Sequence, residues 1–151
     1  MKLIQHRVNS LDDLKKVPLM YGAEIDVRYH EEQLILHHDP FNHHLSDPET
    51  LENFLSNCKI TGPIILNLKT EGIEEKCISL INKYHIKDWF FLDMSMPFFA
   101  RFANNLHDYN INKDNLAVRY SEFEAIEYAL SFKNKVGWIW IDCFKNLPLN
   151  R

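Results

Sequence analysis

Short apolar runs of strand length recur along this chain, and most are followed by a stretch in which apolar residues have helical spacing. The runs are rich in β-branched, leucine or aromatic residues and are too short to be buried helices. Several are apolar at consecutive positions, as in parallel sheets that are covered on both faces. We therefore predict an α/β fold. The predicted strands are residues 2–5, 23–27, 34–37, 63–68, 89–92, 115–119 and 137–141.

Local signals mark where helices begin between these strands. A serine followed three residues later by an acidic residue is a capping box, and proline is favoured in the first turn of a helix. The signals are Ser10 with Asp13, Ser121 with Glu124, Asp47-Pro48 and Met96-Pro97. The predicted helices are residues 11–20, 48–57, 73–85, 97–107 and 122–132.

Only residues 28–33 separate the second and third predicted strands, which is too short for a crossover helix and predicts a β-hairpin. If the turn centres on residues 31–33, Asp26 lies opposite His38. A shift of one residue would place His37 there instead and turn His38 to the other face.

Polar residues able to do chemistry collect at the carboxyl ends of the predicted strands, where the loops of a (β/α) barrel build the active site. We therefore expect a TIM-type (β/α) barrel with one β-hairpin insertion, as a single domain over residues 1–151. A full barrel has eight parallel strands and typically ~250 residues. This chain offers six parallel strands and the hairpin, so the barrel is expected to lack its last one or two βα units. The polar residues are His6, Arg7, Glu24, Asp26, His38, Asp39, Asn67, Lys69, Asp93, Ser95, Arg119 and Asp142.

Composition argues against several classes of protein. No window approaches ~18 consecutive apolar residues, and His6-Arg7 interrupt any apolar core of a signal peptide, so we expect a cytoplasmic protein without stable membrane insertion. The net charge is −4 with no basic stripe, which makes nucleic acid a poor candidate partner. Cys58, Cys77 and Cys143 form no CxxC pair and are expected to be reduced, mostly buried thiols.

Residues near the first strand ends suit the chemistry of a phosphodiester. Glu24 and Asp26 lie two apart on one predicted strand, so they project to the same side and offer oxygen ligands, which favours Mg²⁺ or Ca²⁺. Hydrolysis needs a base, an acid and cations opposite the phosphoryl oxygens. Arg7 can hold phosphate through two N–H groups, and Lys69 adds a point charge.

An ordered series of motifs extends over residues 3–70. The motifs are His6-Arg7-x-Asn9, Glu24-x-Asp26-Val27, His38-Asp39 and a strand ending in Lys69. In order and spacing the series resembles the glycerophosphodiester phosphodiesterase family, relatives of the phosphatidylinositol-specific phospholipases C. The resemblance implies metal-dependent hydrolysis of a glycerophosphodiester or a related polyol or sugar phosphodiester, with His6 and His38 as the general acid/base pair in an order it does not fix.

Two positions depart from the pattern of this family. Val8 stands where the family has glycine, which is tolerable if the backbone there has a negative φ. Asn67 stands where the family has a glutamate that binds the metal. Its amide oxygen would still complete a metal site with Glu24 and Asp26, more weakly than a carboxylate does, and Glu71 could replace it if the strand extends that far.

Alternative interpretations follow from these departures. A weakened family member would bind a phosphorylated ligand without turnover, and an unrelated (β/α) metallohydrolase is a more distant reading. A barrel stopped early would leave a strand edge and apolar faces uncovered, so we expect the chain to form a homo-oligomer such as a dimer, or to aggregate.

The remaining histidines suggest no fixed metal site. A cluster of His37, His43 and His44 with Asp39 and Asp47 is interpreted as a polar loop or a substrate contact, because it lacks a spacing set by a helix or strand. Outside that cluster, the histidines expected at the surface are His30, His85 and His107.

Overall fold

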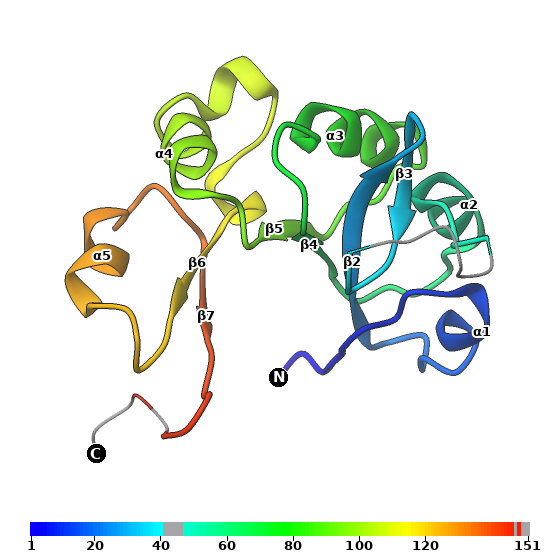
Figure 1. Ribbon diagram of the computed structural model, residues 1–151, viewed down its shortest axis with the longest axis horizontal. Helices are drawn as coiled ribbons and strands as arrows, with labels where there is room; N and C mark the ends of the chain where they lie inside the picture. Colours follow the sequence, from blue (N-terminus) through cyan, green and yellow to red (C-terminus); the bar gives the residue numbers. More distant parts are fainter. Residues whose placement is uncertain (41–46, 147, 149–151) are drawn as a thin grey trace. The chain divides into compact units, whose positions relative to one another are not determined.

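The structure is a computed structural model that describes residues 1–40, 47–146 and 148. The chain divides into two compact units, Met1–Trp89 and Phe90–Arg151 (Figure 1). The boundary falls within a strand, β5 (Trp89–Leu92). Each unit is described by itself below.

The first unit is built on a long central strand, β2 (Gly22–His30). One edge of β2 pairs with β4 (Ile64–Leu68) in parallel, from Ala23↔Ile64 to Val27↔Leu68. Every residue of β4 is buried, as expected for a parallel strand covered on both faces. Two further strands pair with β2, namely β1 (Ile4–Gln5) in parallel and β3 (Gln33–Leu36) antiparallel.

The predicted hairpin is present, but the predicted register is wrong by one residue. The pairs run from His30↔Gln33 to Val27↔Leu36, so the connection is two residues long, Glu31 and Glu32. Both have positive φ, 44° and 66°, as in the tight turns that match the twist of a hairpin. His37, rather than His38, therefore follows opposite Asp26, and its N–H donates to the Asp26 carbonyl at 2.9 Å.

Three helices lie in the described part of the first unit, and all three are shorter than predicted. They are α1 (Leu11–Leu14), α2 (Leu51–Asn57) and α3 (Glu74–Lys83). Ser10 caps α1 as predicted, accepting from the Asp13 N–H, but Pro18 disfavours helical backbone at the residue before it. Thr50 rather than Asp47 caps α2, because Thr50 is extended and bridges Ile35.

The second unit contains two paired parallel strands and an aromatic core. The strands are β6 (Ala117–Tyr120) and β7 (Trp138–Ile141), in register from Ala117↔Trp138. The helices are α4 (Met96–Asn104), α5 (Ile126–Ser131) and the 3₁₀ turns η1 (Leu106–Tyr109) and η2 (Lys113–Asn115). Phe99 packs edge-to-face on Phe132 with ring centroids 4.7 Å apart.

Proline begins α4 as predicted, whereas α5 begins later than predicted. The Ser121 hydroxyl contacts the Glu124 carboxylate and accepts from the Phe123 N–H, so these residues form a turn before the helix. Among the described residues, every helix is too short or too polar to cross a bilayer.

The α/β class with parallel strand pairs is confirmed. No closed barrel forms among the described strands, and the TIM-type barrel stays a prediction.

All three cysteines are free thiols, but only Cys77 is buried, while Cys58 is half-buried and Cys143 is exposed. The prediction that the thiols are mostly buried is therefore wrong.

Candidate functional site

Two adjacent strands of the first unit bring three of the predicted site residues together. Glu24 and Asp26 project from the same side of β2, and Asn67 on β4 is the register partner of Asp26. All three side chains are buried, with exposed fractions of 3% for Glu24, 0% for Asp26 and 8% for Asn67. Buried carboxylates in a sheet are costly unless they are hydrogen-bonded or paired, so each partner matters.

The Glu24 carboxylate accepts one hydrogen bond on each oxygen. The Arg7 backbone N–H donates to Oε2 at 2.7 Å, and the Asn67 Nδ2 amide donates to Oε1 at 2.7 Å. Arg7 has a positive φ of 55°, and the next residue, Val8, donates its N–H to the Glu24 carbonyl at 2.9 Å. Val8 is fully buried and is not among the positive-φ residues, so the chain accommodates valine in place of the family glycine.

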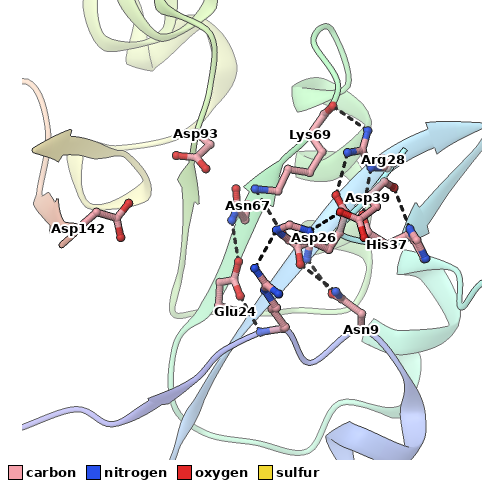
Figure 2. A network of polar contacts seen from close by, with 12 residues as sticks. Asn9, Glu24, Asp26, Arg28, His37, Asp39, Asn67, Lys69, Asp93 and Asp142 are labelled. Carbon is pink, nitrogen blue, oxygen red and sulfur yellow. Dashed lines mark hydrogen bonds and ion pairs between the residues drawn. The ribbon is translucent and has the colours of Figure 1, made fainter. Parts of the chain in front are cut away.

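Asp26 is held by Asn9 on one side and faces Lys69 on the other. Asn9 Nδ2 donates to Asp26 Oδ2 at 2.8 Å, and Asn9 Oδ1 accepts the Asp26 backbone N–H at 2.8 Å. Lys69 Nζ lies 3.4 Å from Asp26 Oδ1, at ion-pair distance, and the lysine side chain is 19% exposed. Figure 2 shows Glu24, Asn67, Asp26 and Lys69 as one polar network.

His38 lies between the Arg7 guanidinium and the Asp39 carboxylate, although the hairpin register places His37, and not His38, opposite Asp26. Its Nδ1 is 2.9 Å from Asp39 Oδ1, and its Nε2 is 3.1 Å from Arg7 Nη2. The hydrogen bond from His38 holds the pKa of Asp39 below its usual value, so Asp39 is an ionised acceptor at neutral pH. Because a guanidinium can only donate, Nε2 accepts from Arg7 and the ring proton lies on Nδ1.

The register prediction made the position of His38 depend on its pairing with Asp26, and that reasoning was wrong. β3 ends at Leu36, so His38 lies beyond the ladder and strand alternation does not fix its direction. His37 directs Nδ1 to the Asp39 carbonyl at 2.8 Å. Contacts beyond the strand therefore decide which histidine meets Arg7.

His6 lies on the segment that joins β1 to the site residues Glu24 and Asp26. His6 follows β1 at once and is exposed, and the next three residues, Arg7, Val8 and Asn9, form hydrogen bonds with Glu24 and Asp26.

Glu71 does not lie on the strand that carries Asn67. β4 ends at Leu68, and Glu71 is an exposed turn residue, so the proposal that it replaces the missing ligand by strand extension is wrong.

The surface location predicted for three other histidines is confirmed for two of them and not for His30. His85 and His107 are exposed, and His30 is half-buried. His43 and His44 lie outside the described residues.

Buried oxygens on two of the site residues make no hydrogen bond. These atoms are Asp26 Oδ1 and Asn67 Oδ1, on register partners of neighbouring strands. Over the described ranges, no group of three or more His, Cys, Asp or Glu side chains is placed to hold a metal ion. A cation here would therefore depend on the Asn67 amide oxygen as well as the two carboxylates.

Sequence reasoning missed Arg28 and Glu74. Arg28 lies on the same face of β2 as Glu24 and Asp26, because alternate residues of a strand project to one side, so the sequence could have predicted its place near the site. Glu74 is 2% exposed in the first turn of α3, and no sequence signal distinguishes it from a surface carboxylate.

The second unit has its own cluster of charges at the ends of its strands. Arg119 forms ion pairs with Asp93 and, from Nε at 3.3 Å, with Asp142, whose Oδ1 accepts from Trp140 Nε1 at 3.0 Å. Three residues predicted at strand ends thus meet here, beside a pocket of about 290 Å³. The ion pairs engage the arginine with two carboxylates, which suits a structural role.

No family model, curated protein or solved structure matches this chain. The resemblance described above therefore rests on the motif residues themselves, and the geometry around them carries the functional argument.

Proposed function

We propose that this protein is a phosphodiesterase of the glycerophosphodiester phosphodiesterase type, which hydrolyses a small phosphodiester with Mg²⁺ or Ca²⁺. The observation that supports it most is the arrangement of His38 between Arg7 and Asp39, in the same network as buried Glu24 and Asp26. The substrate class is a glycerophosphodiester or a related polyol or sugar phosphodiester.

Glu24, Asp26 and Asn67 would hold the cation. The two buried oxygens without hydrogen bonds, Asp26 Oδ1 and Asn67 Oδ1, are hard donors of the kind that Mg²⁺ and Ca²⁺ take. When bound, a divalent cation would offset negative charge on the phosphoryl oxygens.

Arg7 and Lys69 would bind the phosphate. The Arg7 guanidinium carries five donors in a planar fork, of which Nη2 is directed at His38, and a fork of this shape suits two phosphoryl oxygens. Lys69 is the partly exposed cation of the network and supplies a second positive charge.

His38 would be the general base, and His6 the general acid. With its proton on Nδ1 and directed to Asp39, His38 offers the Nε2 lone pair to a proton of the attacking water, whose oxygen forms the new bond to phosphorus as the bond to the leaving alkoxide breaks. The base must release its contact with Arg7 when the guanidinium turns to phosphate. His6 is then assigned to donate a proton to the leaving alkoxide.

A second candidate is a family member that binds phosphate esters without turnover. It is favoured by the Glu24 carboxylate, because both of its oxygens already accept protein donors, and by the Lys69 ammonium beside Asp26. These contacts balance the buried charges of the network without a metal.

The fold, the cellular location and the oligomeric state are proposed together with this function. The location of the polar residues at strand ends supports a (β/α) barrel. Free thiols support a cytoplasmic setting. Ile139 and Ile141 on β7 are 56% and 43% exposed, which supports a homo-oligomer that covers them. A single monomeric species in sedimentation at tens of micromolar would overturn the oligomer.

Hydrolysis of bis(p-nitrophenyl) phosphate with Mg²⁺ or Ca²⁺, with and without EDTA, tests the proposal. Turnover that EDTA abolishes, and that Asp26→Asn loses while the exposed control Asp12→Asn retains, would support it. Binding of inorganic phosphate without EDTA-sensitive turnover would favour the second candidate. A protein that neither turns over the diester nor binds phosphate would exclude both.

A further inference from the structure

Arg28 makes three hydrogen bonds to backbone carbonyls near the site. Its Nε donates to the His37 carbonyl at 3.1 Å, Nη2 to the His38 carbonyl at 2.8 Å and Nη1 to the Lys69 carbonyl at 3.4 Å. The side chain lies among these segments in Figure 2. One guanidinium therefore joins two segments that are distant in the sequence.

Both segments lie beyond the strands from which they emerge. β3 ends at Leu36 and β4 ends at Leu68, so the strand ladders do not continue past His37 and Lys69. Only the first residue of each segment makes a sheet-like bond, from the His37 N–H to Asp26 and from the Lys69 N–H to Val27. Beyond these bonds, the direction of the His38 and Lys69 side chains depends on where the backbone carbonyls of the two segments are held.

We propose that Arg28 is a positioning residue, which sets the His37–His38 segment against the Lys69 turn and thereby places the His38 ring toward Arg7. Its effect on hydrolysis rests on the proposed function, whereas its effect on the place of His38 does not. Arg28 touches no reacting atom in this role.

The shape of the guanidinium is essential to this role. Its three nitrogens form a rigid plane, so one side chain can donate in three directions at once. A lysine keeps the positive charge but has one ammonium on a flexible stem, and it cannot reach carbonyls on both segments in the same way. Arg28→Lys therefore separates geometry from charge.

The experiment compares Arg28→Lys and Arg28→Met with wild type and with Tyr29→Phe. Tyr29 is the next residue of β2, and its hydroxyl accepts from Lys76 at 2.8 Å on the exposed side of the hairpin, so it is a matched control away from the site. The first readout is the NMR signal of the His38 ring, identified by its loss in His38→Gln. The second is kcat and KM for bis(p-nitrophenyl) phosphate.

In both Arg28 variants, the His38 ring signal should shift or broaden, while the signals of His85 and His107 stay in place. We expect kcat to fall about 10- to 100-fold, with a KM change below about threefold, because misplacement of a catalytic group by ~1 Å costs rate of this order. Tyr29→Phe should match wild type in both readouts.

Wild-type His38 signals in Arg28→Lys would overturn the inference, as would loss of folding in both variants, since the carbonyls held by Arg28 lie outside the core. If wild type shows no turnover, the proposed function fails. The His38 signals then still decide the role of Arg28, because that readout requires no activity.

Discussion

Asn67→Asp is the perturbation that tests the buried network most directly. The substitution is nearly isosteric, and it replaces the Nδ2 donor, which lies 2.7 Å from Glu24 Oε1, with a carboxylate oxygen. A favourable hydrogen bond thereby becomes a contact between two acidic groups inside the sheet. The variant should be less stable, and its loss of stability should depend on pH.

The magnitude follows from the distance. Two unit charges 2.7 Å apart repel by about 6 kcal/mol at an effective dielectric constant of about 20. Keeping one carboxyl protonated at pH 7 costs less, about 4 kcal/mol, because an ordinary carboxyl titrates about three pH units lower. The native variant should therefore share one proton between Glu24 and the new carboxylate at position 67, and lose about 4 kcal/mol of stability at pH 7.

The pH dependence has a definite sign. The native variant binds one proton that its unfolded chain releases, so its stability falls as pH rises, by about 1.4 kcal/mol per pH unit between about pH 5 and 7. The difference from wild type should therefore shrink as pH is lowered over that range. Asn82→Asp makes the same chemical change at an exposed position of α3 and should show neither effect.

Urea unfolding monitored by circular dichroism at pH 5, 6 and 7 measures this difference, and repeating it with Mg²⁺ or Ca²⁺ tests the metal site. A third carboxylate should strengthen divalent binding. A metal concentration 100 times the Kd of Asn67→Asp should stabilise that variant by about 2.7 kcal/mol, and the same concentration should stabilise wild type less. A pH-independent loss of stability would refute the proton-sharing argument. Equal effects of the metal on both proteins would refute Asn67 as a ligand.

The strands could be predicted from the sequence because burial imposes a clear pattern. β4 and β5 are dominated by apolar residues and are buried along their whole length, as expected for strands covered on both faces. Helix lengths were harder, since tertiary pairing decided them. Thr50 bridges Ile35 as an extended residue, and no local signal announces such a partner.

The hairpin register could not be read from its sequence. A two-residue turn with positive φ at both positions is usually signalled by Asn or Gly, and here Glu31 and Glu32 occupy it. The longer turn was the natural expectation, and it displaced the predicted pairing by one residue.

The sequence predicts the part of the site that lies within the strands, where side chains alternate between the two faces with a period of two residues. Glu24, Asp26 and Asn67 are neighbours because strand parity and parallel register place them on one face. His38 lies beyond β3, where Arg7 and Asp39 determine its position. Side-chain contacts of this kind leave no periodic trace in a sequence.

Three further results are expected. Asp39→Asn should lower kcat about 10- to 100-fold, because a neutral amide orients His38 less strongly, and an unchanged kcat for bis(p-nitrophenyl) phosphate would refute that role. Cys143 is the exposed thiol, and burial raises the pKa of the other two, so Cys143→Ser should remove the fast phase of iodoacetamide modification; persistence of that phase would contradict the assignment. Desolvation raises the pKa of Glu122, but backbone N–H groups of residues 144–146 outweigh it and lower that pKa to about 2. A carboxyl with a lowered pKa stabilises the folded form at pH values above its ordinary pKa of 4.5, and that stabilisation is lost as pH falls toward 2. Hydrogen exchange at residues 144–146 should therefore be slow at pH 7 and should accelerate in Glu122→Gln. Equal exchange in both proteins would show that the Glu122 carboxylate does not hold this segment.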